Sequence, residues 1–201
     1  PIVLPPAEIA ARTTDTHKSV PAIAKVLHVI NGEHFSGAER VQDLLGLQLP
    51  KIGFPVDFAC AKPDRFPTQR QAQASHVHDV TMSSRWCRVA VRRLERIVRE
   101  YDYDILHAHT PRTLMLASQV ARRTNRPLVY HVHSPAQKDS TRFFQNKING
   151  WVEKRSLRAA AHLITVSASL AKWMEQLGFD PKRITVVHNG VPRTKIRRTD
   201  D

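Results

Sequence analysis

The sequence predicts an α/β fold, a doubly wound and mostly parallel sheet of about seven strands. Short β-branched and apolar runs alternate along the chain with longer amphipathic segments. Helical segments of about ten or more residues can return the chain to the start of a parallel strand, which a short turn cannot do. The strands are almost continuously apolar, which is typical of a sheet covered on both faces. With 201 residues, 41% of them apolar, the chain is long enough for one domain with a packed core.

The predicted strands follow one another at regular intervals. They are residues 26–30, 56–61, 76–80, 104–109, 127–133, 163–166 and 184–188. The third is the weakest, because its apolar run is short, and a loop rich in Pro, Gln and Arg precedes it. Each of these runs is short enough for a strand and is followed by a turn or a helical pattern.

The predicted helices lie between these strands. They are residues 37–49, 85–101, 114–123, 140–161 and 168–177. Pro50 should end the first helix, and Pro111 fits the first turn of the third. Ser167 is the expected N-cap of the last helix, which Gly178 should close.

Two of these helices have a clear apolar stripe. The side chains expected to face the sheet are Ala38, Val41, Leu44 and Leu45 in the first helix, and Trp86, Val89, Ala90, Leu94, Ile97, Val98 and Tyr101 in the second. The outer face of the second helix should then carry its arginines, which are Arg85, Arg88, Arg92, Arg96 and Arg99.

The composition also predicts domain limits and compartment. Residues 1–23 mix proline, threonine and charges without a period, so we expect a mobile leader before a single domain over residues 24–192. No apolar run approaches the roughly 20 residues needed to cross a bilayer, and no secretory signal is apparent. We therefore expect a cytoplasmic chain in which Cys60 and Cys87 are free thiols.

The charge is strongly basic. Lys and Arg number 31 against 18 Asp and Glu, a net charge of +13. Such a balance favours anionic partners, among them nucleic acid, acidic lipid headgroups and phosphorylated substrates. It is equally consistent with a chain whose acidic part lies elsewhere.

Polar residues follow the first predicted strand, and ligands bind beyond the carboxyl ends of strands in such sheets. Ser36 and Gly37 can present backbone N–H groups at a helix N-terminus, which is a ready anion site. The same residues also fit a simple tight turn capped by Ser36. Only Gly32 and Gly37 are present in this turn, so it is not a dinucleotide-binding GxGxxG motif.

Two histidine pairs end neighbouring predicted strands, His107 with His109 and His131 with His133. Residues two apart in a strand face the same side, so each pair points into one crevice. Histidine is a favoured zinc ligand, but no acidic residue stands beside these pairs to complete a hydrolase site. Histidines that hydrogen-bond a substrate are the preferred interpretation, with His109 and His133 as the outer, ligand-contacting members and His107 and His131 in the core. A third pair, His76 and His78, is expected to face solvent.

Five short motifs occur in an order that resembles a known family. They are Ser36-Gly-Ala-Glu-Arg40, Asp104-Ile-Leu-His-Ala-His109, Tyr130-His-Val-His-Ser-Pro135, Thr165-Val-Ser167 and Val186-Val-His-Asn-Gly-Val191. Together they resemble the N-terminal domain of the family-four retaining glycosyltransferases, which have the GT-B architecture. The resemblance covers about residues 25–192 and implies a Rossmann-like domain that forms one half of that architecture.

The resemblance implies that the two halves of the architecture bind different substrates. The N-terminal half mainly holds the sugar acceptor, which could be a glycan, a lipid or a small molecule, and a C-terminal half holds the nucleotide-sugar. Residues 193–201 would be a linker stub, and the chain would be inactive alone. The resemblance implies no metal or other cofactor, and nucleic acid is not an expected partner. A further possible partner is the acidic inner surface of the membrane.

The resemblance also implies roles for single residues. His109 would be the catalytic residue near the reacting centre, and the substrate-binding residues would be Ser36, Gly37, Glu39, Thr110, His133 and Ser134. Asn189 and Gly190 would lie at the passage to the donor half. The family often has Gly-Gly where this chain has Ser36-Gly37, and Asp where it has Pro192.

Two other classes of function stay open. One is a metal hydrolase built on the histidine pairs. The other is a non-enzymatic module that binds anions or a membrane surface through the arginine-rich helix, although such a face is more often simply solvated.

Overall fold

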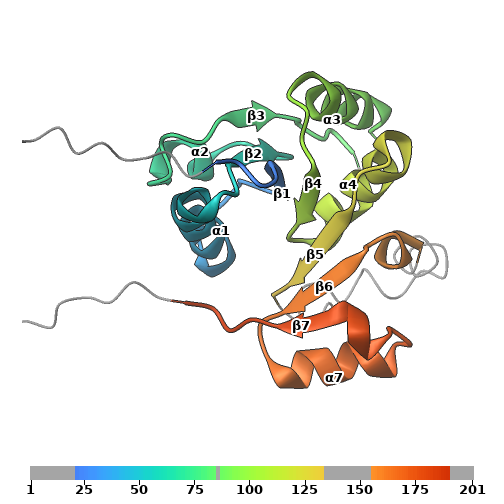
Figure 1. Cartoon of the computed structure of the whole chain (residues 1–201). Coiled ribbons are helices and arrows are strands. Elements are labelled where there is room, and N and C mark those ends of the chain that lie inside the picture. The colour runs from blue at the N-terminus through green and yellow to red at the C-terminus, as the bar shows by residue number, and fades with distance from the viewer. Residues whose placement is uncertain (1–20, 85–86, 134–154, 191–201) are drawn as a thin grey trace, which may run out of the picture.

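A computed structural model describes residues 21–84, 87–133 and 155–190, and all structural statements concern these ranges. Their centre is one seven-stranded sheet in the order β3-β2-β1-β4-β5-β6-β7, in which every neighbouring pair is parallel. The strands are β1 (Val26–Ile30), β2 (Val56–Cys60), β3 (Val77–Asp79), β4 (Ile105–Ala108), β5 (Leu128–Val132), β6 (His162–Thr165) and β7 (Ile184–Val186). The order runs outward in both directions from β1 and β4, so the predicted doubly wound fold is confirmed (Figure 1).

The helices agree closely with the predicted limits. They are α1 (Gly37–Gln48), α2 (Arg65–Gln69), α3 (Arg88–Glu100), α4 (Pro111–Thr124) and α7 (Ala168–Gln176), with 3-10 turns at Leu49–Ile52 and Pro181–Arg183. The short α2 lies in the segment predicted as a loop. The helix predicted over 140–161 falls mostly outside the described residues, although residues 155–158 are helical. The predicted leader (1–23) lies almost entirely, and the linker (193–201) wholly, outside those ranges.

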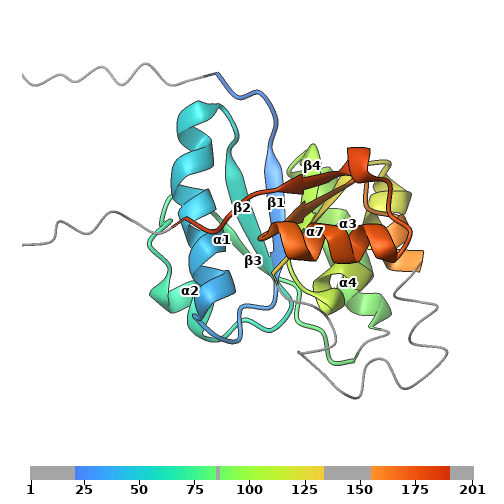
Figure 2. The same ribbon diagram turned by 90° about the horizontal axis from the view of Figure 1, so that it is seen from below.

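Two hydrophobic cores lie on opposite faces of the sheet. The larger contains Leu27, Val29 and Leu106 and continues into α3, α4 and α7. The smaller contains Val26, Ile30 and Phe58. The alternation of residues 26 to 30 between the two clusters follows from the two-residue period of a strand. Figures 1 and 2 show α1 and α2 beside β1 to β3, and α7 against β6 and β7 at the other end of the sheet.

The inward face of α1 differs from the prediction. The buried residues of this helix are Glu39, Gln42, Asp43 and Gly46, whereas Ala38, Val41, Leu44 and Leu45 are only half-buried. The Asp43 carboxylate accepts the backbone N–H groups of Gln71 and Ala72, at 2.8 and 2.9 Å. The helix is therefore held by a buried polar contact with the loop after α2, and apolar periodicity does not reveal such a contact.

The second predicted stripe is correct for Ala90, Leu94, Ile97 and Val98 of α3, which are buried. Val91, which was not predicted, takes the buried position in place of Val89, which is 71% exposed. Tyr101 follows the helix and is exposed, and Trp86 lies outside the described residues. The described arginines of the predicted outer face are all exposed.

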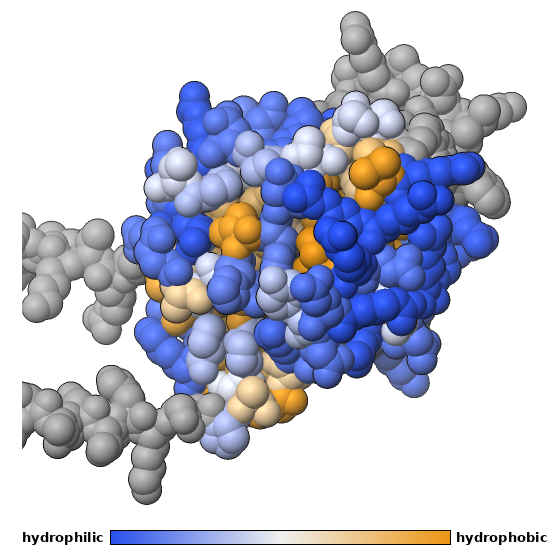
Figure 3. Space-filling model, turned by 90° about the horizontal axis from the view of Figure 1, so that it is seen from above, coloured by the Kyte–Doolittle hydropathy of each residue, from blue (hydrophilic) through white to orange (hydrophobic). Residues whose placement is uncertain are grey.

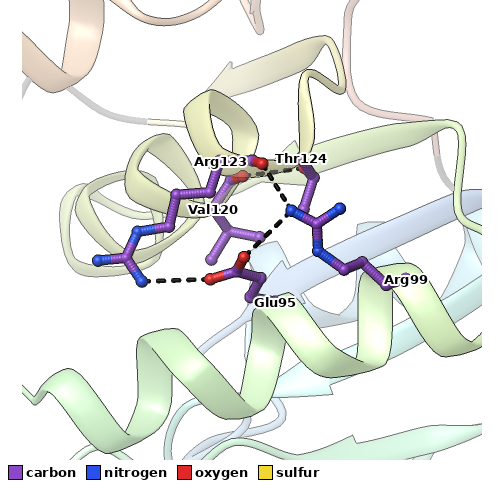
Figure 4. A network of polar contacts seen from close by, with 5 residues as sticks. All are labelled: Glu95, Arg99, Val120, Arg123 and Thr124. Carbon is purple, nitrogen blue, oxygen red and sulfur yellow. Dashed lines mark hydrogen bonds and ion pairs between the residues drawn. The ribbon is translucent and has the colours of Figure 1, made fainter.

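The face of α3 and α4 carries a small ion-pair network. Glu95 accepts from the guanidinium groups of Arg99 and Arg123, at 3.2 Å each, and Arg99 also donates to the Arg123 carbonyl at 2.7 Å (Figure 4). Exposed pairs of this kind contribute little to stability, typically below about 1 kcal/mol. The network ties α3 to α4 and leaves Arg88, Arg92 and Arg96 facing solvent. Figure 3 shows the molecule from above the view of Figure 1, the side on which α3 lies. The surface seen there is mainly hydrophilic, with some hydrophobic residues between the hydrophilic ones.

Of the two histidines at β3, His76 and His78, only the first is exposed as predicted. His76 is exposed, but His78 is half-buried, with Nε2 2.9 Å from the Tyr103 hydroxyl. That hydroxyl donates to the Asp57 carboxylate at 2.6 Å. The prediction that His78 faces solvent is wrong, because the chain before β4 brings Tyr103 beneath this edge of the sheet.

No helix of the described ranges is long and apolar enough to cross a membrane.

Candidate functional site

The turn between β1 and α1 forms one side of the candidate site. Ser36 is the N-cap of α1, and its hydroxyl donates to the Glu39 carboxylate at 2.6 Å. Ser36 and Gly37 are exposed, and Glu39 is buried beneath them. A Cβ added at Gly37 would meet nothing within 4 Å, so the space beside this N-terminus is open. The interpretation of Ser36 as a helix cap is confirmed, and the anion site at the first turn of α1 stays a prediction that the open space at Gly37 permits.

The turn after β4 lies next to it. Thr110 is the N-cap of α4, and its hydroxyl accepts the Thr113 N–H at 3.3 Å. The same hydroxyl donates to the side-chain oxygen of Asn31 at 3.4 Å. This hydrogen bond joins the start of α4 to the residue that follows β1, where the strand order reverses between β1 and β4, which is the usual place for a ligand in doubly wound sheets.

Five histidines lie on one face of three adjacent strands, close to these turns. His28 on β1 pairs in register with His107 on β4. We name His28, His107, His109, His131 and His133 the histidine cluster. Neighbouring strands are parallel and residues two apart face one side, so all five imidazoles point to the same side of the sheet.

His109 is at the centre of the histidine cluster. Its Nε2 is 2.9 Å from Nδ1 of His28, and its Nδ1 is 3.2 Å from Nε2 of His133. The ring of His131 stacks on those of His107 and His133, with centroid distances of 5.6 and 4.2 Å. A chain of imidazole contacts therefore runs from β1 through β4 to β5.

Burial keeps these imidazoles neutral. It lowers the pKa of His28 to about 3 and that of His131 to about 2, with a smaller contribution from the charge of His131 in the first case and of His133 and His107 in the second. It also holds the pKa values of His107 and His109 well below the usual value. For His133, burial lowers the pKa and the Glu39 carboxylate opposes that shift.

The structure does not separate the two histidine pairs by depth as predicted. His109 is 3% exposed and His107 is 7% exposed, so His109 is not an outer residue. Only His133 is half-buried and reaches toward solvent. His28 from β1 and His133 after β5 lie on either side of His109, and strand position alone does not show that.

His28 is the cluster member that the sequence analysis missed. It lies in the predicted first strand, which is buried as expected, but a single histidine in an apolar run does not indicate a functional site. The doubly wound strand order could have indicated it, because that order sets β1 beside β4 and so aligns His28 with His107.

Three predicted site residues remain. Asn189 and Gly190 lie beyond the carboxyl end of β7, and Ser134 is not among the described residues. Asn189 and Gly190 are exposed, and His188 before them contacts the Val166 carbonyl at 3.1 Å. Among the described residues no hydrogen bond joins this segment to the histidine cluster.

The histidine cluster is also where a metal ion could be held. Within the described ranges, two sets of three imidazoles have nitrogens within 4.8 Å of one another: His28 with His107 and His109, and His109 with His131 and His133.

Comparison with known proteins identifies similar chains. An Escherichia coli protein, UDP-Gal:alpha-D-GlcNAc-diphosphoundecaprenol alpha-1,3-galactosyltransferase, is 29% identical over 105 residues, which are 51% of this chain and 27% of that protein. The crystal structure of Anabaena HepE in complex with UDP-glucose superposes with a TM-score of 0.68 at 20% identity, over 84% of this chain and 44% of that one. Acinetobacter baumannii MurG gives a TM-score of 0.59 at 13% identity, over 86% and 47%.

These structural matches confirm the predicted fold, including its likeness to one half of the GT-B architecture. The chain spans less than half the length of these proteins. Neither the metal hydrolase nor the non-enzymatic module is favoured by any of them. A family model described as Glycosyltransferase Family 4 matches residues 35–195, well over half of the sequence. The chain therefore belongs to glycosyltransferase family 4.

Proposed function

We propose that this chain is the acceptor-binding half of a retaining glycosyltransferase that uses a nucleotide-sugar donor. The observation that carries this proposal is that the turn after β1, the N-cap of α4 and the histidine cluster lie together at the switch point between β1 and β4, in a chain of this family. The E. coli relative is named for a UDP-galactose donor, and the HepE crystals contain UDP-glucose. Both favour a UDP-sugar as the donor, held mainly by a second domain that faces this one.

The exposed first turn of α1 suits the donor's phosphates. Its N–H groups and the positive end of the helix dipole would stabilise the charge that develops on the leaving phosphate. The Ser36–Glu39 contact keeps this turn rigid, so that its N–H groups are preorganised. In a front-face reaction the acceptor oxygen bonds to the anomeric carbon on the side that the phosphate leaves, and the acceptor proton passes to a phosphate oxygen.

The acceptor would then contact His133 near the surface and His109 deeper in the site. The half-buried His133 contacts the acceptor, and Thr110 and Ser134 are further acceptor-binding residues in this proposal. His109 reaches a sugar hydroxyl when that hydroxyl replaces Nε2 of His133 as the partner of His109 Nδ1, and the freed Nε2 of the half-buried His133 then pairs with the acceptor. A neutral imidazole offers one donor and one acceptor for this purpose. Asn189 and Gly190 lie toward the donor half.

The test is the kinetics of His109→Ala in the full-length protein, with a UDP-sugar and a prenyl diphosphate-linked sugar acceptor. If His109 contacts the sugar chiefly in the transition state, kcat falls on the order of 10²-fold, more than the acceptor KM rises. His107→Ala is the control, because it removes a buried ring of the same cluster and should act through a lower melting temperature. Normal turnover of the His109 variant with unchanged melting would contradict the proposed role.

We also propose that the arginine face of α3 rests on an acidic membrane surface on the cytoplasmic side. The acceptor in the name of the E. coli relative is linked to undecaprenol, and a lipid-linked acceptor would be met at a membrane. Arg88, Arg92 and Arg96 are exposed on successive turns of α3 and are not among the arginines that Glu95 binds. Basic residues near an anionic surface contribute roughly 1 kcal/mol each.

Vesicle sedimentation tests this surface. The chain should bind vesicles that contain an anionic lipid and not neutral ones, and Arg88→Gln/Arg92→Gln/Arg96→Gln should lose most of that binding. The matched control is Lys51→Gln/Arg65→Gln/Lys172→Gln, which removes the same charge from exposed positions elsewhere. Equal loss in both triple variants would mean that net charge, and not this face, is responsible.

A further inference from the structure

The second imidazole set of the histidine cluster has the spacing of a metal site. His109, His131 and His133 each offer a ring nitrogen, and these nitrogens lie within 4.8 Å of one another. Nδ1 of His109 and Nε2 of His133 are 3.2 Å apart. Two nitrogens bound to zinc at about 2.0–2.1 Å in a tetrahedron are separated by about 3.3 Å. An ion could take the place of the shared proton once both rings turn, because a bound ion lies off the line between the two nitrogens.

The ring nitrogens of this set have few other partners. His131 is 3% exposed, and no described residue is a hydrogen-bond partner of either of its nitrogens. Nδ1 of His133 is also buried with no partner among the described residues. Buried polar atoms are nearly always paired, so a residue with both nitrogens unpaired in the described region points to a ligand that would occupy one of them.

We propose that His109, His131 and His133 form a binding site for a divalent transition-metal ion with the ligand preferences of Zn²⁺. Imidazole is a common ligand of such ions, and three protein ligands leave a fourth position for water or a small ligand. His133 is half-buried and borders solvent, so the ion has an entry path. The Glu39 carboxylate acts on His133 and offsets part of the ion's charge.

His28 is the residue that would orient the central ligand. With the proton of His109 on Nε2, that nitrogen donates to Nδ1 of His28 at 2.9 Å, and the lone pair on Nδ1 faces His133. A second hydrogen bond on the far side of a ligating imidazole is the usual way to fix its tautomer. The alternative set, His28 with His107 and His109, has three buried members and no solvent-facing one.

The site does not depend on the proposed transferase activity, which requires no metal. It shares His109 and His133 with the proposed acceptor side, however, so an ion bound there would occupy nitrogens that a sugar hydroxyl needs. Zn²⁺ would then inhibit transfer.

The experiment uses the purified 201-residue chain after removal of metal by a chelator. Zn²⁺ titration by calorimetry should give one tight equivalent, and Co²⁺ should give the visible absorption of a four-coordinate nitrogen site. His131→Asn and His133→Asn should each weaken Zn²⁺ binding at least about 10²-fold, and His28→Asn about 10- to 100-fold. His76→Asn is the matched control and should bind like the unaltered chain, because His76 is exposed at the far edge of the sheet.

Circular dichroism of each variant separates loss of a ligand from loss of the fold. If the variants unfold, the titration of the unaltered chain still tests the proposal. Absence of tight binding of one Zn²⁺ per chain there would overturn the site. Unchanged binding in folded His131→Asn and His133→Asn would overturn it as well. Loss of binding only in His107→Asn would move the ion to the alternative set and contradict this assignment.

Discussion

At the scale of single residues, the two cysteines show how burial sets reactivity. Both are free thiols, as expected. Burial raises the pKa of Cys60 to about 12. Cys87 is the N-cap of α3, and the backbone N–H of Ala90, with the Ser83 hydroxyl, lowers the pKa of its thiol.

Alkylation at pH 8 should therefore distinguish the two cysteines. A lower pKa means more thiolate at a given pH, so Cys87 should react with iodoacetamide, and Cys60 should react only after unfolding. Mass spectrometry of the labelled chain gives the site and the rate. Cys87→Ser should leave no fast-reacting thiol, and labelling of Cys60 in the folded variant would contradict its burial.

At the scale of an element, α1 shows how one small residue sets the position of a helix. A Cβ added at Gly46 would lie 2.8 Å from the Phe58 ring and 3.0 Å from the Ala72 side chain. Both neighbours are almost fully buried, so neither can move freely. The close approach also brings Asp43 to the backbone of the loop at residues 71–72.

We expect Gly46→Ala to destabilise the chain. Alanine favours a helix over glycine by about 1 kcal/mol, but overpacking a buried site costs about 1–3 kcal/mol, and here the two effects oppose each other with the larger one unfavourable. Chemical denaturation measures the difference in the free energy of unfolding. Gly37→Ala is the control, because it lies in the same helix with open space around its Cβ position. A gain in stability for Gly46→Ala would show that α1 can shift away from β2.

At the scale of the whole molecule, the chain presents one wall of the proposed active site. The open turn of α1, Thr110 and the histidine cluster all lie at the carboxyl ends of the strands. The proposed donor-binding domain would face this wall and hold most of the nucleotide. The basic α3 packs on the face of the sheet opposite the histidine cluster, so the proposed membrane contact and the proposed donor-binding domain would use different surfaces.

The chain by itself should therefore bind a nucleotide-sugar weakly. The turn of α1 alone offers a few N–H groups to the phosphates, and we expect a Kd for UDP-glucose of about 1 mM or weaker, which is about 4 kcal/mol of binding free energy. Calorimetry with the purified chain measures it. Micromolar affinity would contradict the proposed division between the two halves.

Much of this could be predicted from the sequence, because the decisive signals are local. The apolar runs of β1, β4 and β5 and the stripe of α3 depend on periods of two and 3.6 residues. Parallel pairing then follows from the length of the crossovers. The same-side orientation of His107 with His109 and of His131 with His133 also follows from the period of a strand.

Only the tertiary structure decided which residues meet across the sheet. His28 reaches His109 from 81 residues away, and Asp43 holds a loop 28 residues further on. The burial of His109 involves His28 and His133 from the neighbouring strands, and the half-burial of His78 involves Tyr103. Contacts of this kind are set by the packing of distant segments, and no periodicity within one segment carries information about them.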